Sequence, residues 1–572
     1  MSRRRLLAQN RRMAVLAMLA IALPMPAWSA DASDHLNTRQ PERPAFLAPS
    51  ADPPFRLPEV PGTSLLPDKA DDETVFVAHI VFRGNRAIST PELAALAAPY
   101  AGQRLGEAAL EALRQELTHH YIAQGYVNSG ALLGENALSG DTLTIDIVEG
   151  RLLGIRLSGL DGLNERYVSG RLQGDPAAAL NTDMLRERFA LLVGDPLFKR
   201  LDARLIPGEQ RGEALLDIAV ERELPYRLTA YANNHRPPSI GSNLLGLSGS
   251  LANLSGHGDL LEASLQTPPQ DSTSLRGSLA WRLPLNPRGS VLTLQYERSQ
   301  SAVVEAPMEA LNIRSVLDSR EIGISQTVLE SLQQRLTLGL GNVRRENRSS
   351  LLGQPFSFVA GEPDGVTRIT AWRFWQDYSY RSQNQVLALR STFSTARNNL
   401  LSPEQNAVPE PVAQPQGHYD LWLGQAQWAR QVMDNGAQLV LRGSVQKTAQ
   451  QLMALDRMSI GGNSTVRGYR ENQLLRDRGV IFNVEFDYPL LKAADPGLNL
   501  SLIPFYDTAR GRNLKEAADT LASAGIAARL RWQGFSLDLA VARRLQHPDA
   551  ITRNGGTWQD RGVHCQLSYR FY

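Results

Sequence analysis

Few residues of this 572-residue sequence have the types and spacing that bond chemistry would require. Glu485 and Asp487 are carboxylates two positions apart, a spacing compatible with acid–base catalysis, but on a strand both would line one solvated wall. The adjacent His119 and His120 fall in a helical pattern, where exposed or partly packed histidines are the simpler explanation. The stretch 246–250 lacks the final glycine of a nucleophile elbow, and there is no Walker loop. The sequence therefore predicts no enzymatic activity, no cofactor and no metal site.

Composition disfavours further classes of function. The 60 basic and 58 acidic residues nearly balance, so no charge of one sign covers the chain. This argues against a nucleic-acid partner, which would require a basic surface. The single cysteine, Cys565, allows no intramolecular disulfide and no cysteine cluster for zinc.

The first thirty residues have the order of a secretory signal peptide. A basic stretch ends at Arg12, residues 13–24 are apolar, and small residues follow at 27–30. The apolar run is too short to anchor the chain, and no later segment approaches twenty apolar residues. We therefore expect residues 1–30 to be removed on export, and any membrane crossing to use strands. Residues 31–73 are rich in proline and indicate a linker or arm, with room for a short helix at 34–40.

Residues 74–149 and 150–223 repeat one order of elements: strand, helix, helix, strand, strand. In the first repeat the predicted elements are 75–82, 91–98, 110–121, 126–133 and 142–148. In the second they are 153–160, 163–172, 184–193, 197–206 and 214–220. Each repeat is about 75 residues long, small but feasible as a fold, so we expect two α+β modules in tandem.

From residue 224 to the end, helical periodicity nearly vanishes and segments of about ten residues alternate apolar with polar positions. For example, Phe482, Val484 and Phe486 share one face, and Asn483 and Glu485 share the other. We count sixteen such segments. Connections after even-numbered segments are short, whereas those after odd-numbered ones are often long, at 300–318, 346–366, 397–419 and 448–478. This asymmetry predicts a membrane β-barrel of about 16 antiparallel strands over residues 224–572 rather than a soluble sandwich.

One long connection carries a recognisable motif. Within 448–478 the sequence runs Ser459-Ile460-Gly461-Gly462-Asn463-Ser464-Thr465-Val466-Arg467-Gly468-Tyr469-Arg470. The Val466-Arg467-Gly468-Tyr469 run resembles the signature loop of the POTRA-bearing outer-membrane barrel superfamily. The wider stretch, which includes 477–479 and 485–486, resembles the two-partner secretion transporters of filamentous haemagglutinins and haemolysins.

The resemblance covers nearly the whole mature chain and carries several implications. It implies POTRA 1 at 74–149, POTRA 2 at 150–223 and an inward-folded loop at 448–478. It also pairs Arg467 with Asp507, in a pattern that begins at Phe505 and has Ala509 where the family has glycine. The family often carries an N-terminal plug helix, for which this chain offers a short, proline-broken arm.

The function that the resemblance implies is outward transport of a polypeptide. POTRA domains would capture an unfolded exoprotein in the periplasm, and the barrel would release it at the cell surface. An extended client can add as a strand to a sheet edge beside a helix. The candidate client-binding residues are Leu110, Leu113, Leu117, Tyr121, Tyr126 and Val127, although the same residues could simply form the domain's own core.

The expected location is the outer membrane, with the POTRA domains in the periplasm. The expected partners are a secreted adhesin, haemolysin or related exoprotein, outer-membrane lipid and lipopolysaccharide, and the barrel-assembly machinery during insertion. The last of these is indicated by a final strand that ends with Leu567, Tyr569 and Phe571 at alternate positions. Two alternatives remain at this point. A general barrel insertase of the same superfamily would be expected to carry more POTRA domains, and a passive porin would carry neither these modules nor the loop motif.

Overall fold

The computed structural model describes residues 35–47, 55–56, 74–400 except 135, 136, 176, 270, 272 and 360, and then 415–492, 497–546 and 556–571. The predicted signal peptide, residues 1–30, lies outside these ranges. The chain forms two compact units, one built from the barrel and residues 35–47, and the other from the two repeats. None of the helices in the described ranges combines the length and the apolar character needed to cross a membrane.

The first repeat is a small sheet packed against two helices. Its elements are β2 (Val75–Val77), β3 (His79–Arg83), α2 (Thr90–Ala97), η3 (Ala98–Tyr100), β4 (Gln103–Leu105), α3 (Glu107–Ala123), β5 (Gly130–Leu132), β6 (Leu138–Ser139) and β7 (Thr142–Val148). Strand β7 is central, with β3 parallel on one side and β5 antiparallel on the other. The side chains of Leu113, Leu117 and Tyr121 on α3 pack into the core against Ile145 of β7. Helix α3 is therefore held by the apolar face that its sequence periodicity predicted.

The second repeat has the same topology. Its elements are β8 (Arg151–Ser158), α4 (Glu165–Leu172), α5 (Thr182–Val193), β9 (Phe198–Pro207) and β10 (Glu213–Arg222). Strand β10 pairs parallel with β8 and antiparallel with β9, as β7 does with β3 and β5. Asn181 caps α5 by accepting hydrogen bonds from the backbone N–H groups of Asp183 and Met184. The predicted repetition is thus a repetition of sheet topology.

The strand predicted at 126–133 is wrong in its first half. Residues 126–129 form a turn, and β5 begins only at Gly130. Helix α3 ends at Ala123, Gly125 follows with a positive φ of 87°, and the Tyr126 N–H donates a hydrogen bond to the Tyr121 carbonyl oxygen. The Tyr126 ring packs edge-on against the Tyr121 ring, with 6.0 Å between the ring centroids. This packing holds residues 126–129 in a turn at the end of the helix, and they do not extend the strand.

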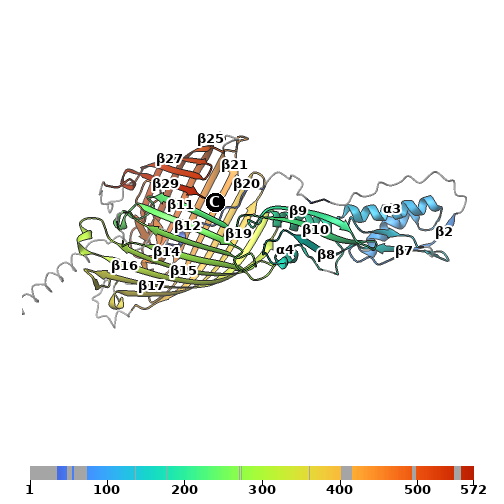
Figure 1. Ribbon diagram of the computed structural model, residues 1–572, viewed down its shortest axis with the longest axis horizontal. Helices are drawn as coiled ribbons and strands as arrows, with labels where there is room; N and C mark the ends of the chain where they lie inside the picture. Colours follow the sequence, from blue (N-terminus) through green and yellow to red (C-terminus); the bar gives the residue numbers. More distant parts are fainter. Residues whose placement is uncertain are drawn as a thin grey trace, which may run out of the picture. The chain divides into compact units, whose positions relative to one another are not determined.

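Within the described ranges, sixteen antiparallel strands close into a barrel. They are β11 (Tyr226–Asn233), β12 (Leu244–Ala252), β13 (Leu260–Thr267), β14 (Arg276–Pro284), β15 (Ser290–Ala302), β16 (Arg314–Glu330), β17 (Gln334–Leu351), β19 (Val366–Arg381), β20 (Gln385–Asn398), β21 (His418–Gln431), β22 (Gln438–Thr448), β25 (Arg478–Lys492), β26 (Asn499–Arg512), β27 (Asp519–Trp532), β28 (Phe535–Arg544) and β29 (Val563–Arg570). A two-residue strand, β18 (Gln354–Pro355), extends the edge of β17. The barrel closes where β11 pairs with β29, so no strand edge is left open. Figure 1 shows neighbouring wall strands such as β14 to β17 running side by side.

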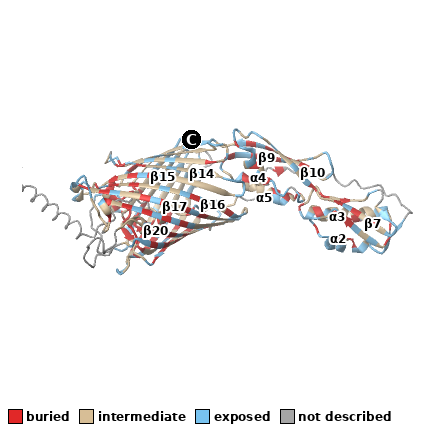
Figure 2. Cartoon of the chain, turned by 90° about the horizontal axis from the view of Figure 1, so that it is seen from below, coloured by how far each residue is buried: buried red, intermediate tan, exposed pale blue. Residues whose placement is uncertain are grey.

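Alternation along each strand separates a lumen face from a lipid face. On β26, Ile503, Phe505 and Asp507 are buried, whereas Tyr506 and Arg510 are exposed. Much of the barrel wall is coloured as intermediate in burial in Figure 2. The wall is a single layer of strands, so a side chain on either face is covered by the strands on one side only. The predicted alternation of connections is also present: the connections at 331–333, 382–384 and 533–534 are short, whereas 352–365, 399–417 and 449–477 are long.

The arm at 35–47 lies in the barrel lumen. It contains a single turn, η2 (Leu36–Thr38), in place of the longer helix for which residues 34–40 left room. Gln425 and Gln427, on the lumen face of β21, donate hydrogen bonds to the backbone carbonyl oxygens of Arg39 and Pro41 at 3.1 and 3.0 Å. Wall amides therefore bind the arm through its backbone.

Candidate functional site

The long connection between β22 and β25 folds into the barrel lumen. It contains η7 (Ala454–Asp456) and a small antiparallel pair, β23 (Met458–Ile460) with β24 (Leu474–Arg476). Val466 and Tyr469 of this loop are fully buried and share an apolar cluster with Ile481, Ala509 and Leu521 on the lumen face of β25, β26 and β27. Burial of these apolar loop side chains against the wall helps to hold the loop inside the lumen.

Arg467 and Asp507 form a buried, two-pronged ion pair. Arg467 Nε lies 2.7 Å from Asp507 Oδ2, and Nη2 lies 2.8 Å from Oδ1. The backbone N–H of Arg467 donates a third bond to Asp507 Oδ2 at 3.1 Å. The side chain of Arg467 is 7% exposed and that of Asp507 is 0% exposed. The structure thus brings together the two residues that the family resemblance had paired.

Other groups complete the surroundings of this pair. Glu485 Oε1 lies 2.7 Å from Arg467 Nη1, and Asn483 donates to Asp507 Oδ1 at 2.8 Å. The guanidinium of Arg467 stacks on the Phe505 ring at 3.5 Å from its centroid. Arginine suits this position because its planar fork can contact two carboxylates and an aromatic face at once, which a lysine ammonium cannot do.

The other motif residues fix the backbone around Arg467. Gly468 has φ of 90°, and a Cβ placed on it would lie 2.9 Å from the Cβ of Ala542. Its N–H donates to His564 Nε2 at 3.2 Å. The Tyr469 hydroxyl donates to the Ala522 carbonyl oxygen at 2.9 Å. Each motif residue therefore has a packing or hydrogen-bonding reason for its identity.

The backbone two positions after the aspartate is regular despite the departure from the family pattern. Ala509 pairs with Ile481 on one side and Leu521 on the other, and β26 continues to Arg512 without a register shift there. Its methyl group lies in the apolar cluster that holds the loop. The alanine is thus accommodated in an ordinary strand conformation.

A second buried ion pair anchors the start of the loop to other strands. Asp456 of η7 bonds to the guanidinium of Arg345 on β17 and to the hydroxyl of Tyr419 on β21. Arg345 and Asp456 are 6% and 4% exposed. Burial by itself raises the pKa of Asp456, but the positive charges of Arg345 and Arg373 outweigh it and keep that pKa below its ordinary value. This pair was not predicted from the sequence, because its members are 111 positions apart and no local spacing signals it.

Three further contacts between an arginine and a carboxylate hold the loop. Asp477, with a fully buried side chain, lies 3.2 Å from Arg457 Nε and so connects the two ends of the loop. Arg470, directly after the motif, contacts Asp560 at 2.5 Å and Glu305 at 2.9 Å, both in other connections of the barrel. The loop is therefore bound through charged groups along its whole length.

Half of the predicted client-binding residues are inaccessible. Leu113, Leu117 and Tyr121 are 0% exposed, and their prediction as a client surface is wrong for the folded module because they form its own core. Leu110, Tyr126 and Val127 are partly exposed. Helical spacing identifies a buried face, but it does not say whether the module itself or a partner covers that face.

Comparison with known proteins gives a consistent result. The family described as "Haemolysin secretion/activation protein ShlB/FhaC/HecB" matches residues 212–532, and "POTRA domain, ShlB-type" matches residues 75–150. The chain is 22% identical over 489 residues to the outer membrane transporter CdiB of Dickeya dadantii, with 82% of each chain covered. It is 23% identical over 485 residues to the heme/hemopexin transporter protein HuxB of Haemophilus influenzae, covering 81% of this chain and 80% of the relative.

A solved structure of CdiB from Escherichia coli has a similar fold. The TM-score is 0.67 at 20% identity, and the alignment covers 89% of this chain and 93% of the other. The family model thus covers most of the barrel, and the POTRA domain type covers the first repeat.

Proposed function

The chain belongs to the haemolysin secretion/activation family ShlB/FhaC/HecB, and from that membership we propose that it captures an unfolded exoprotein in the periplasm and passes it through its barrel to the cell surface. The protein is an outer-membrane transporter of the two-partner secretion type, with its POTRA domain in the periplasm. The client is a secreted adhesin, haemolysin or related exoprotein. The barrel-assembly machinery inserts the barrel and acts on its aromatic final strand.

One observation in the repeats carries the proposed mode of capture. An extended segment of the chain itself, β1 (Phe55–Arg56), adds parallel to the edge strand β9 of the second repeat, with Phe55 opposite Ala203. The Phe55 ring is 8% exposed and lies 5.8 Å from the ring of Phe189 on α5. A sheet edge beside a helix thus accepts an extended strand and buries one of its aromatic side chains. Strand addition needs these two kinds of contact, backbone pairing and a side-chain pocket.

The first repeat offers a similar edge. Strand β5 is at the end of its sheet, and the partly exposed Leu110 lies on the neighbouring helix α3. Tyr126 and Val127 lie just before this strand and are also partly exposed. We assign client contact in this module to these three residues, in place of the buried face of α3.

The lumen is suited to an extended, solvated polypeptide. Beside the arm and the loop remains a space of about 790 Å³, lined by polar side chains such as Ser264, Arg276 and Gln295. Polar groups from a client can exchange hydrogen bonds with such a wall, as the arm does with Gln425. Folding of the client outside the cell would favour net outward movement, with no nucleotide required.

Deletion of the gene tests this function. Mass spectrometry of the culture supernatant and the cell surface should show the loss of one large exoprotein, with other outer-membrane barrels at their normal levels. An unchanged set of secreted proteins would contradict the transport function. A general loss of outer-membrane barrels would instead support an insertase.

A further inference from the structure

We propose that the lipid-facing surface of β19 to β26 contains a binding site for a phosphorylated, acylated glycolipid of the outer leaflet, the chemical class of lipopolysaccharide. The site combines a row of basic side chains at the outer end of the strands with an aromatic hollow below it. This inference rests on the outer-membrane location of the barrel and is independent of the proposed transport.

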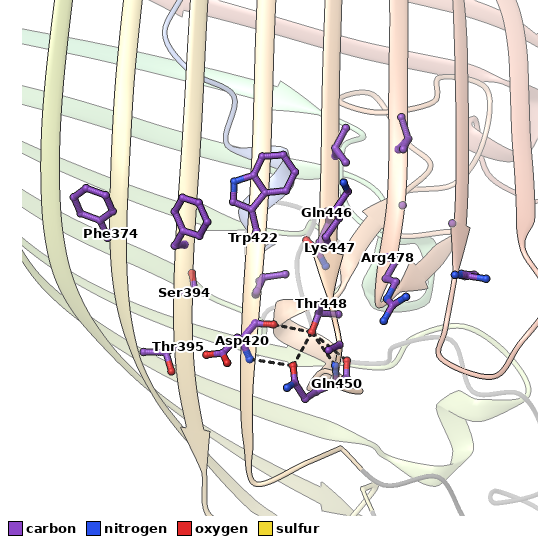
Figure 3. A pocket seen from close by; sticks show the side chains of 18 of the residues that line it. Phe374, Ser394, Thr395, Asp420, Trp422, Gln446, Lys447, Thr448, Gln450 and Arg478 are labelled. Atoms are coloured by element: carbon purple, nitrogen blue, oxygen red, sulfur yellow. Dashed lines mark hydrogen bonds between the residues drawn. The ribbon is translucent and has the colours of Figure 1, made fainter.

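The hollow has a volume of about 1070 Å³ and lies on the wall of the barrel. Much of its apolar lining comes from lipid-facing positions of strands between β17 and β25, namely Leu340, Trp372, Phe374, Phe393, Trp422 and Val480. Figure 3 shows Phe374 and Trp422 on this wall, with Lys447 and Arg478 beside them. Its size is at the upper end of the range for small-ligand pockets, and flat aromatic faces suit acyl chains.

The basic row crosses three neighbouring strands. Arg478 is the first residue of β25 and lies directly opposite Arg512, the last residue of β26. Lys447 follows Gln446, which pairs with Gly479, so Lys447 lies beside Arg478 on the other side. Arg510 lies one step further along the same face, opposite Val480. Like charges on directly opposed residues destabilise a sheet, so this arrangement calls for an anion that offsets the repulsion.

No acidic residue in the described ranges supplies that anion. Lys447, Arg478, Arg510 and Arg512 have no carboxylate oxygen within 4.0 Å among the residues described by the structure. The Nζ of Lys447 lies over the Trp422 ring, 5.6 Å from its centroid. The one acidic side chain in the lining, Asp420, faces His418 at 3.8 Å.

Another part of the same barrel shows a different arrangement. Exposed arginines on β17 and β19 alternate with carboxylates: Arg368 lies 2.8 Å from Glu346, and Arg348 bonds to the same Glu346. Arg348 and Arg368 therefore share an acidic neighbour, whereas Arg478 and Arg512 have none among the residues that the structure describes. An anion from outside the chain can supply the counter-charge for this row.

The height of the row fits the boundary of the membrane. The lipid-facing residues of β25 from Val480 to Leu490 are all apolar or aromatic. They extend about 34 Å along the strand at about 3.4 Å per residue, or about 24 Å in height at a tilt of about 45°. Arg478 lies two residues before Val480, just beyond the outer end of this apolar band, at the level where phosphate groups of the outer leaflet lie. A phosphate on a sugar headgroup can bridge two opposed guanidinium groups, while its acyl chains occupy the aromatic hollow.

Binding of defined lipids to the full-length protein in detergent tests the proposal. Native mass spectrometry and titration followed by tryptophan fluorescence should show binding of bisphosphorylated lipid A. Lipid A without phosphates should bind at least tenfold more weakly, and inorganic phosphate should not compete at equal concentration. The double variant Arg478→Gln/Arg512→Gln should lose at least tenfold in affinity, and Trp422→Ala should also weaken binding.

A matched control removes two exposed arginines from other strand ends. Arg368→Gln/Arg543→Gln changes the net charge by the same amount and should bind lipid A as the wild type does. Arg478→Lys/Arg512→Lys should retain part of the affinity, because charge is kept while the two-pronged geometry is lost. If the glutamine pair fails to insert, Lys447→Gln makes the same comparison with one charge. Equal binding of lipid A with and without phosphates, equal binding by the Arg478/Arg512 variant, or equal binding of phosphatidylglycerol would each overturn the proposal.

Discussion

Arg467 on the inward-folded loop and Asp507 on β26 are joined by two parallel hydrogen bonds, from Nε to Oδ2 at 2.7 Å and from Nη2 to Oδ1 at 2.8 Å. Both side chains are shielded from water, so the pair belongs to the class in which removing one partner costs about 3–5 kcal/mol. The pair joins a loop to the wall, and we expect its loss to act on the position of the loop.

Arg467→Ala should reduce export strongly while the barrel still reaches the membrane, and Asp507→Ala should have a similar effect. The double variant should be little worse than either single one, because both remove one interaction. Arg467→Lys should rescue poorly, since an ammonium cannot contact Asp507 and Glu485 through a planar fork. Secreted exoprotein per inserted barrel is the measurement. Additive losses, or normal export by either alanine variant, would show that the pair has no role in transport.

Asp456→Ala should loosen the start of the loop, because it leaves Arg345 buried without its carboxylate. We expect larger channel conductance in planar bilayers and lower export, with a smaller effect for Tyr419→Phe. Asp420→Asn is the control, since its carboxylate is mostly exposed on the same strand as Tyr419. The pKa of Asp456 is lowered in the folded protein, so its ionised carboxylate stabilises the folded state fully above about pH 4, the ordinary pKa of aspartate. This stabilisation is lost as the pH falls through the lower pKa of the folded state. Wild-type conductance in Asp456→Ala would exclude an anchoring role.

Gly468→Ala should disturb the motif in two ways. Its φ of 90° is unfavourable for alanine, at about 1–2 kcal/mol, and the new methyl group would meet Ala542. Gly353→Ala separates the two effects, because Gly353 has φ of 78° with nothing within 4 Å of its Cβ position. The temperature at which the unboiled protein loses its anomalous gel migration should fall more for Gly468→Ala. Equal shifts would mean that contact with Ala542 is unimportant.

Deletion of residues 74–149 should leave a barrel that inserts but does not export. The cut falls between the end of β7 at Val148 and the start of β8 at Arg151, so no strand is divided. Heat-modifiable gel migration checks the barrel, and mass spectrometry of the supernatant checks export. Normal secretion by this variant would remove client capture from the first repeat.

Phe55→Asp should release β1 from the edge of the second repeat, because a carboxylate cannot remain in the contact with Phe189 without a partner. A freed edge should bind an extended client segment more tightly, measured by crosslinking to a photoreactive residue introduced at Ala203, the residue opposite Phe55. Arg56→Asp changes the neighbouring residue of the same strand and should have less effect. Unchanged crosslinking in Phe55→Asp would show that β1 and the client do not compete.

Much of the architecture follows from local sequence alone. The strands of the barrel can be predicted because residues alternate between lipid-facing and lumen-facing positions along each segment, as in Phe482, Asn483 and Val484. The repeat of strand, helix, helix, strand, strand can also be predicted, because apolar residues recur with different periods in helices and in strands. Strand ends were less well defined: residues 314–318 belong to β16 and not to the connection predicted at 300–318, because cross-strand pairing with β17 continues past the apolar band.

Other features were decided only by tertiary structure. The alternation along residues 502–507 was ambiguous in sequence, and closure of the barrel determined that Asp507 points to the lumen and Tyr506 to lipid. The bond between Arg345 and Asp456 depends on how a loop lies inside a closed wall, so no local pattern encodes it. The buried face of α3 was predicted, yet whether its own module or a client covers Leu117 depended on where the sheet packs. Periodicity is a property of neighbouring residues, whereas these contacts join residues that only the closed fold brings together.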